Sequence, residues 1–448
     1  MAKLTRTAAK AAKPKPSRAA NGLRPAKPAT KPASKPTSKP ASKQAGKPVG
    51  KPIGKPIGKM AVHSAKPAAA AATPKIPPPP ARVPSPYVGR LERLAALVHR
   101  MGSDHLLVSN PVDVGYLTGF LGGDTYLILG PGLGTKRCVL VSDGRYDEEL
   151  NPARSFATVI LRKKGLLETV ADLCRDHGVG KLAIQAEHMT VADASVLRAV
   201  VVGAVEIFET PKLVEKLRVI KDAHECDLME KAIRLQEAAM KAVMPKIVPG
   251  RTELEIAADL ESEMKYRGSS HSWFAPIVGV GANAALPHYR PGMTKVRRNE
   301  IILIDWGSTW QGYGGDMTRV FALGKWPAKM REVYEIVREA QEASAAALAP
   351  GKSTHEVDRV ARDIITKAGY GAEFNHGLGH GLGMSKEPPY LNPLYAPIPL
   401  EVGHVCTIEP GIYLPGVGGV RIEDQYVLTP TGSRNFCKLP KTLAFSTL

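Results

Sequence analysis

The sequence predicts an α/β domain followed by an α+β domain, with a disordered basic tail ahead of both. The chain has 448 residues, and a single hydrophobic core stops growing at roughly 250 to 300 residues, so at least two folded units are expected. Strands first alternate with helical periodicity; later, two long helices precede strands joined by glycine-rich turns. We place the three parts at residues 1–84, 85–215 and 216–448.

The tail is predicted to be extended because proline and lysine recur throughout it. From Lys27 to Gly58, eight tetrads of the KPAS type carry a cation at the first place and proline at nearly every second. Proline blocks helices and central strands, and the apolar area is too small to offset the entropy of ordering. Such an arm binds nucleic acid or another polyanion without sequence preference, or it only raises solubility. The sequence leaves both interpretations open.

The formal net charge of +19 belongs to this tail. Residues 1–82 hold 19 Lys or Arg and no Asp or Glu; subtracting them from 61 basic and 42 acidic residues leaves 42 of each sign from residue 83 onward. The folded part is therefore neutral and reads as an ordinary soluble globule.

Cysteine usage and apolar runs indicate a cytoplasmic protein that does not enter membranes. The five cysteines are an odd number, lie far apart and form no CxxC pair, which argues against a disulfide framework and a thiolate zinc site. The basic start has no apolar core of a secretory signal, and no later stretch approaches 18 uninterrupted apolar residues.

The first domain is predicted to shape or cover a site that lies elsewhere. It begins with helical periodicity at residues 91–101 and has a second helical segment at residues 166–178. Short apolar runs give its strands, and none of them carries metal-ligand spacing. These runs lie at residues 105–109, 125–129, 137–142, 157–162 and 181–186.

The second domain is predicted to open with a long amphipathic helix at residues 223–247. A second helix follows the turn at residues 249–252, where Thr252 can cap it and Glu255 completes a capping box. Further helices are expected at residues 327–349 and 354–369, among strands and glycine-rich turns.

Two aspartates occupy the arms of a predicted hairpin. Asp305 ends one apolar strand run and Asp316 starts the next, with Gly307, Gly312 and Gly314 between them. Holding two desolvated carboxylates side by side is costly unless a cation lies between them. An Asp pair alone is more often a turn or a cap.

Three further groups join this pair. The segment at residues 375–383 carries His376 and His380 on a predicted glycine-rich turn, and Glu409 and Glu423 each end a strand-like run. Four carboxylates and one imidazole form a hard, oxygen-rich set that suits Mn, Co or Mg. Two metal ions roughly 3.5 to 4 Å apart would hold a hydroxide as nucleophile and polarise a carbonyl. The predicted ligands are Asp305, Asp316, His380, Glu409 and Glu423.

The ordered motifs D-x10-D, HGxGHGxG, xEPGxY and GGVRIED resemble the pita-bread metallopeptidases, the family of methionine aminopeptidase, aminopeptidase P, prolidase and creatinase. The resemblance covers roughly residues 87 to 440, and the first domain looks like the N-terminal domain of the prolidase and aminopeptidase P branch. It implies a pita-bread catalytic domain, a homodimer and two divalent ions; Mn is expected, with Co or Zn as alternatives.

The resemblance also implies roles. Asp305 would chelate one ion, and Asp316 and Glu423 would bridge both. His380 and Glu409 would bind the other, with Glu409 as the proton shuttle.

Around these ligands, the resemblance implies that His288 and His376 contact the substrate. Arg421 would pair with carboxylates of the metal ligands. Tyr413 would contact the oxyanion or the substrate, support the site from behind, or only pack. Without the alignment of motifs, His288 is better read as an ordinary loop histidine.

One segment departs from the family pattern. Relatives have HExP after the HGxG motif, and dipeptide-cleaving members often add an arginine next. This chain reads MSKEPPYL, so Lys386 or Glu387 takes the histidine position and Tyr390 takes that of the arginine. A lysine can still donate to a developing oxyanion, whereas an ionised carboxylate cannot. Activity and dipeptide preference are therefore the open points.

The expected function is cleavage of the Xaa-Pro bond at the N-terminus of short proline-containing peptides, with a tilt toward substrates longer than dipeptides. One alternative is a pita-bread protein of weak or altered activity that acts mainly through polyanion binding by its tail. Another is hydrolysis of a non-peptide amide or ester by the same metal ions.

Overall fold

The structure is a computed structural model that describes residues 85–133 and 136–448. The disordered tail predicted for residues 1–84 lies outside the described residues. Within the described ranges, no helix combines the length and the apolar character that a membrane crossing needs.

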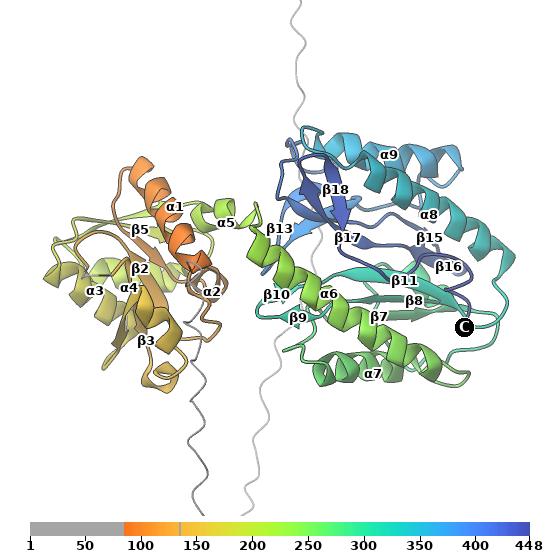
Figure 1. The fold of residues 1–448 in the computed structure, drawn as a ribbon, viewed down its shortest axis with the longest axis horizontal. Coiled ribbons are helices and arrows are strands. Elements are labelled where there is room, and N and C mark those ends of the chain that lie inside the picture. Colours follow the sequence, from red (N-terminus) through yellow and green to blue (C-terminus); the bar gives the residue numbers. More distant parts are fainter. Residues whose placement is uncertain (1–84, 134–135) are drawn as a thin grey trace, which may run out of the picture. The chain divides into compact units, whose positions relative to one another are not determined.

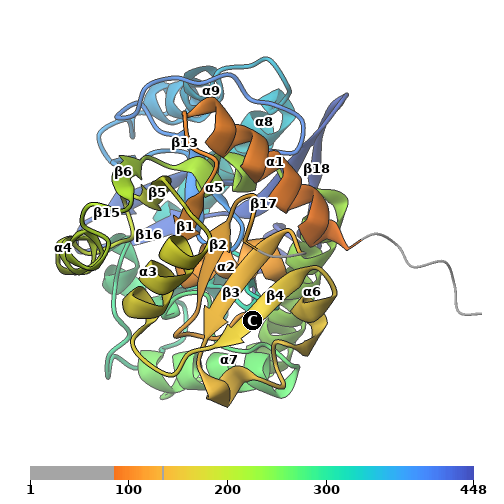
Figure 2. The same ribbon diagram turned by 90° about the vertical axis from the view of Figure 1, so that its left-hand side faces the viewer.

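The first part of the chain forms a six-stranded mixed sheet in the order β4-β3-β2-β1-β5-β6. Figure 2 shows β2, β3 and β4 side by side. The strands are β1 Leu106–Val108, β2 Tyr126–Leu129, β3 Cys138–Ser142, β4 Ala157–Leu161, β5 Lys181–Gln185 and β6 Glu206–Thr210. The helices are α1 Pro86–Arg100, α2 Pro111–Thr118, α3 Leu166–Asp176, α4 Val191–Val200 and α5 Leu213–Arg218.

The α/β layer predicted from the apolar runs is confirmed, whereas α2, α4 and β6 were not predicted from the sequence. Helix α2 is short and six of its eight residues are buried, so it shows no one-sided apolar stripe for a periodicity argument to detect. Asn110 caps it by accepting from the Val112 amide, 3.1 Å away, and Pro111 opens it.

The second part layers four helices and several small sheets (Figure 1). In that view α9 lies above the strands and α7 lies below them, while α6 and α8 run diagonally. The helices are α6 Ala223–Val243, α7 Glu253–Tyr266, α8 Ala328–Ala347 and α9 Thr354–Lys367. The predicted capping box of α7 is confirmed: Glu255 N donates to Thr252 Oγ1, and Glu255 Oε2 accepts from Thr252 N.

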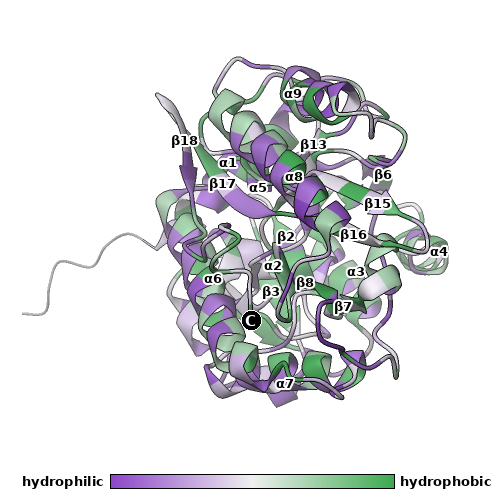
Figure 3. Ribbon diagram, turned by 90° about the vertical axis from the view of Figure 1, so that its right-hand side faces the viewer, coloured by the Kyte–Doolittle hydropathy of each residue, from purple (hydrophilic) through white to green (hydrophobic). Residues whose placement is uncertain are grey.

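Two sheets and two short hairpins carry the strands of this part. The sheets have the orders β11-β8-β7 and β13-β12-β14-β17-β18, and the hairpins are β9-β10 and β15-β16. Figure 3 shows β7 and β8 in the green of apolar residues. The strands are β7 Ile277–Val280, β8 Ile301–Trp306, β9 Thr309–Trp310, β10 Tyr313–Gly314, β11 Met317–Ala322, β12 Gly379–Leu382, β13 Lys386–Leu391, β14 Val405–Ile408, β15 Gly411–Leu414, β16 Gly418–Arg421, β17 Asp424–Thr429 and β18 Gly432–Asn435.

The predicted aspartate hairpin is present. Strands β8 and β11 pair antiparallel with Asp305 opposite Thr318, and Asp316 directly precedes β11. Glu409 follows β14, and Glu423 lies between β16 and β17. The four carboxylates therefore stand at strand ends, as the apolar runs predicted.

The prediction that His380 lies on a glycine-rich turn is wrong, because His380 belongs to strand β12. Its neighbours are glycines for a steric reason. A Cβ on Gly379 would lie 2.1 Å from Thr407 O, and one on Gly381 would lie 2.2 Å from Pro388 O. Glycine within a strand marks this close approach of neighbouring backbones. The domain boundary at residues 215 and 216 stays a prediction.

Candidate metal centre

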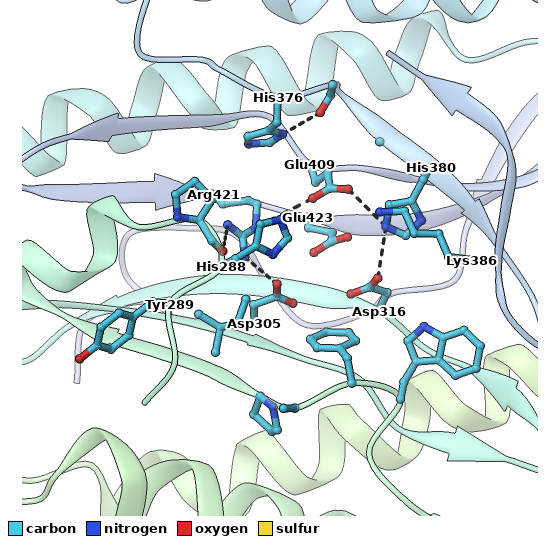
Figure 4. Close-up of a pocket in the computed structure, with 18 of the residues that line it drawn as sticks. His288, Tyr289, Asp305, Asp316, His376, His380, Lys386, Glu409, Arg421 and Glu423 are labelled. Carbon is cyan, nitrogen blue, oxygen red and sulfur yellow. Dashed lines mark hydrogen bonds and ion pairs between the residues drawn. The ribbon is translucent and has the colours of Figure 1, made fainter. Parts of the chain in front are cut away.

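All five predicted ligands line one cavity of about 1030 Å³. Asp305 comes from β8, Asp316 from the start of β11, and His380 from β12. Glu409 and Glu423 complete the group from the ends of two further strands (Figure 4). Side chains up to 118 residues apart in sequence, from Asp305 to Glu423, are thus brought to one point by the strand ends.

Three of these residues come close enough to share one ion. Asp316, His380 and Glu423 each offer a ligand atom, and these atoms lie within 4.8 Å of one another. His380 Nε2 is 3.7 Å from Asp316 Oδ2 and 3.5 Å from Glu409 Oε1. A neutral imidazole and carboxylates at these separations form a chelating set of the kind that divalent cations bind.

Two buried carboxylate oxygens lack a hydrogen-bond partner among the described residues. They are Asp305 Oδ1 and Glu423 Oε1, and the two residues are 8 % and 1 % exposed. Leaving a buried charged oxygen unpaired costs more than about 1 to 3 kcal/mol. A bound cation would satisfy both, so the residues present fit a metal ion.

Burial and mutual repulsion raise the pKa values of these carboxyls. Burial is the largest cause for Asp316 and Glu423, and repulsion among the four carboxylates adds to it, so both pKa values stand well above the usual range. Burial raises the pKa of Glu409 to about 7. Burial and then Lys386 lower the pKa of His380 to about 3, so its imidazole is neutral and free to ligate a metal.

Arg421 and Thr318 connect the carboxylates behind the cavity. Arg421 Nη2 donates to Asp305 Oδ2 at 2.6 Å, and its Nε donates to Thr318 Oγ1 at 3.0 Å. Thr318 Oγ1 in turn donates to Glu423 Oε2 at 2.6 Å. Sequence reasoning had missed Thr318. Thr318 lies opposite Asp305 in the pairing of β8 with β11, so the strand register would have identified it.

His376 and Tyr413 contact each other next to Arg421. The His376 Nε2 and Tyr413 hydroxyl are 2.9 Å apart, and Arg421 Nη1 donates to the same hydroxyl at 2.9 Å. Burial, then Arg421, lowers the pKa of His376 to about 4. Tyr413 is not among the residues that line the cavity, whereas His288 and His376 are. The geometry thus gives Tyr413 a supporting contact instead of a substrate contact.

The segment that departs from the family pattern forms strand β13, which shows whether Lys386 or Glu387 faces the cavity. Lys386 and Tyr390 line the cavity, and the Lys386 side chain lies beside His380 (Figure 4). Glu387 instead turns into the interior and is 3 % exposed. Lys386 therefore occupies the place facing the ligands, and Tyr390 stacks on Tyr395 with ring centroids 4.5 Å apart.

A second group of potential ligands lies outside this cavity. Asp113, His188 and Glu215 bring one ligand atom each within 4.8 Å, although their spacing of 75 and 27 residues gave no sequence signal. Asp113 already accepts from Arg218 at 2.7 Å and from Gln185 at 2.6 Å. Its charge is balanced by the guanidinium, so this group is an ion-pair cluster.

Known proteins resemble the chain over most of its described residues. Residues 90–220 match the creatinase/prolidase N-terminal domain, and residues 227–430 match metallopeptidase family M24. The uncharacterized peptidase YqhT of Bacillus subtilis is 34 % identical over 79 % of this chain and 99 % of its own length.

Solved structures agree with that match. The Xaa-Pro dipeptidase from Bacillus anthracis has a TM-score of 0.76 and 32 % identity, covering 81 % of this chain and 100 % of its own. The X-Pro aminopeptidase from Thermotoga maritima MSB8 has a TM-score of 0.71 and 31 % identity, covering 77 % and 99 %. The chain therefore belongs to metallopeptidase family M24, in the prolidase branch that carries the creatinase-type N-terminal domain.

Proposed function

We propose that this chain is a two-metal exopeptidase that cleaves the Xaa-Pro bond at the N-terminus of peptides. The main support is the cavity in which four carboxylates and His380 converge. Two buried carboxylate oxygens there have no hydrogen-bond partner among the described residues. Solved relatives named as Xaa-Pro dipeptidase and X-Pro aminopeptidase supply the substrate class.

The five residues would hold the ions in two overlapping sets. Asp305 would chelate one ion, Asp316 and Glu423 would be shared, and His380 with Glu409 would complete the other. When bound, divalent ions polarise the scissile carbonyl and activate the attacking water. Mn is the expected metal for this oxygen-rich set, with Co or Zn as alternatives.

The side chains of the protein would move protons and steady charge. Burial raises the pKa of Glu409 to about 7. Thr407 Oγ1 donates to its Oε1 at 3.1 Å. A carboxyl held this way can take a proton from the attacking water and pass it to the leaving proline nitrogen. The Lys386 ammonium would donate to the developing oxyanion, while His288 and His376 would orient the peptide.

The aromatic pair at the cavity wall favours substrates longer than dipeptides. By the family resemblance, Tyr390 stands where dipeptide-cleaving members often carry an arginine, and it stacks on Tyr395 at an interplanar angle of 23°. A neutral phenol can donate one hydrogen bond to the proline carboxylate of a dipeptide, but it cannot form an ion pair with it. It can pack against a further residue or its backbone instead.

The test is a peptide screen with the Mn-loaded protein. Xaa-Pro-Yaa peptides should release Xaa, Xaa-Pro dipeptides should be poorer substrates, and Xaa-Ala-Yaa peptides should not be cleaved. Glu409→Ala is the control for contaminating peptidase. If the metal-loaded protein released Xaa from neither proline peptide, the proposal would be wrong; cleavage of only non-peptide amides or esters would support the other hydrolase reading.

We also propose non-specific polyanion binding by residues 1–82, which hold 19 Lys or Arg and no acidic residue. Binding of duplex DNA should weaken steeply with salt, and it should be lost when residues 1–80 are removed. Unchanged, salt-sensitive binding by the truncated protein would refute this role. Cleavage of Xaa-Pro-Yaa by the truncated protein would show that the two functions are separate.

A reducing compartment fits the described cysteines. All five are free and buried, so we infer that the protein works in the cytoplasm, where thiols stay reduced.

A further inference from the structure

A chain of buried ion pairs connects the first part of the protein to the strand that carries Lys386. Arg218, at the end of α5, donates through Nη1 to Asp113 Oδ1 at 2.7 Å and through Nη2 to Glu387 Oε2 at 2.8 Å. Lys221 Nζ donates to the other Glu387 oxygen at 2.6 Å. Asp113 lies on α2, so three separate segments meet at Glu387 through two cations.

These four charges are almost fully withdrawn from water. The side chains of Asp113 and Lys221 have no exposed area, and those of Arg218 and Glu387 are 3 % exposed. Two cations and two anions balance, and both Glu387 oxygens are used. Removing one partner of such a buried pair leaves an uncompensated charge, whereas an intact pair fixes geometry more than it stabilises the fold.

Glu387 and Lys386 are neighbours on β13 and face opposite ways. Lys386 lines the metal cavity, while Glu387 points to the ion pairs. The pairing of β12 with β13 shifts register between His380 and Gly381. Because the register is irregular next to His380, backbone pairing alone does not fix firmly which side chains of β13 face the cavity.

We propose that Glu387 is a positioning residue, whose anchorage by Arg218 and Lys221 turns β13 so that the Lys386 ammonium faces the metal ligands. Arg218 also binds Ser385, the residue before Lys386 that itself lines the cavity. The anchor therefore holds the strand on both sides of Lys386.

This role rests on the proposed function, because Lys386 is there the donor to the developing oxyanion. Loss of one such donor costs about 100-fold or more in kcat. A displacement of about 1 Å can cost a similar factor. The anchor thus explains how a lysine, with a long and flexible side chain, can replace a histidine at this place.

A double-mutant cycle on Xaa-Pro-Yaa cleavage tests the proposal. Lys386→Met should lower kcat roughly 100-fold, and Glu387→Gln should lower kcat at least about 10-fold with little change in KM. In the Lys386→Met background, Glu387→Gln should change kcat less than about 2-fold, because the group that it positions is absent. Equal factors in both backgrounds would overturn the proposal.

Mn²⁺ titration of the metal-free proteins separates positioning from general damage. Glu387→Gln should bind Mn²⁺ within about 2-fold of the unaltered protein; a loss of affinity as large as the loss of kcat would overturn the proposal. Glu237→Gln is the matched control, because Glu237 is also buried, binds Arg234 and two backbone amides, and does not line the cavity. It should leave kcat unchanged.

Two further measurements cover other outcomes. If Glu387→Gln does not fold, Arg218→Lys can replace it in the test. This variant keeps the charge but cannot bridge Asp113 and Glu387 at once. It should lower kcat in the unaltered protein and have little effect on kcat in the Lys386→Met background. A crystal structure of Glu387→Gln reports on the Lys386 ammonium without turnover; an unmoved ammonium would contradict the proposal. If the unaltered protein cleaves no Xaa-Pro peptide, the proposed function fails instead.

Discussion

Arg421 holds Asp305 in a buried ion pair, with 2.6 Å between Arg421 Nη2 and Asp305 Oδ2. The same guanidinium donates to the Tyr413 hydroxyl and to Thr318, so one side chain orients three groups at the candidate metal centre. A cation placed here opposes the rise in carboxyl pKa values that burial causes.

Replacing Arg421 by methionine should weaken Mn²⁺ binding roughly 10- to 100-fold. Burial raises the pKa of Asp305 and Arg421 opposes it, so without the guanidinium the proton competes better with the metal. The loss should be larger at pH 6.5 than at pH 8, as measured by Mn²⁺ titration of the metal-free protein. Arg421→Lys should retain more affinity because it keeps the charge; equal losses at both pH values would contradict this explanation.

The metal-free protein should become less stable as pH rises above 6.5. The pKa of Glu409 is raised to about 7, and those of Asp316 and Glu423 also stand well above the usual range, so the folded state holds protons that the unfolded state has released. A raised carboxyl pKa gives stability that is lost as pH rises through the folded value. For Glu409 this loss runs from the ordinary pKa of about 4.5 to the folded pKa of about 7, so only its last part falls above pH 6.5.

His380 and His376 affect the pH dependence of stability in the opposite direction, but in a lower pH range. Their folded pKa values are about 3 and 4, so their contribution is lost only as pH falls below the unfolded value of roughly 6.5. Thermal unfolding in chelator between pH 6.5 and 8 therefore isolates the carboxyls. Excess Mn²⁺ should remove the decline, and a flat chelator curve would show that the carboxyls do not carry these raised values.

Glu423 and its neighbour Asp424 should respond oppositely to neutralisation. Glu423→Gln should abolish tight metal binding and raise the stability of the metal-free protein at pH 8, because it removes one of several crowded charges. Asp424 is buried, but Arg319 and Lys441 hold its pKa below the usual range. Asp424→Asn should therefore cost roughly 3 kcal/mol or more of stability.

Denaturant unfolding with and without Mn²⁺ distinguishes the two variants. The stabilisation by metal should disappear in Glu423→Gln and persist in Asp424→Asn. If both variants lost metal and stability alike, the two adjacent carboxylates would not have the separate roles that their partners indicate.

The site could be predicted from sequence where chemistry shows in residue type. Asp305, Asp316, Glu409 and Glu423 are polar residues at the ends of apolar runs, so their convergence followed from the strand pattern. Thr318 and Glu387 could not be found in this way. Their roles depend on which face of a strand each residue takes, and the register shift beside His380 is set by tertiary packing.

The same holds for secondary structure. Capped helices with one apolar face, such as α7, can be predicted from capping residues such as Thr252 and Glu255. Strand β12 was predicted as a turn because its glycines have low strand propensity. Its glycines serve close backbone contacts that only the assembled sheet reveals. The buried helix α2 had no polar face and so gave no period.

Gly379→Ala should disrupt the metal centre through sterics alone. Its Cβ would lie 2.1 Å from the Thr407 carbonyl oxygen, and a backbone atom in a central strand cannot move aside cheaply. Because His380 follows directly, strand displacement should lower both thermal stability and Mn²⁺ affinity. Gly180→Ala, whose Cβ meets no atom within 4 Å, is the control and should change neither. Unaltered Mn²⁺ affinity in Gly379→Ala would mean that β12 tolerates the strain.

Tyr390→Arg should convert the enzyme toward dipeptides. An arginine at this cavity-lining position can pair with the carboxylate that follows proline in Xaa-Pro, and a charge-assisted hydrogen bond is worth about 1.5 to 3 kcal/mol, or roughly 10- to 100-fold in kcat/KM. The gain should appear with Xaa-Pro and be absent with Xaa-Pro-amide, which lacks the carboxylate. Tyr390→Met removes the ring stacked on Tyr395 without adding a cation, and it should slow cleavage of Xaa-Pro-Yaa without helping Xaa-Pro. Because both variants lose the same stacking contact, an equal rise for Xaa-Pro in the two would trace the effect to space instead of charge and would remove the argument that Tyr390 sets substrate length.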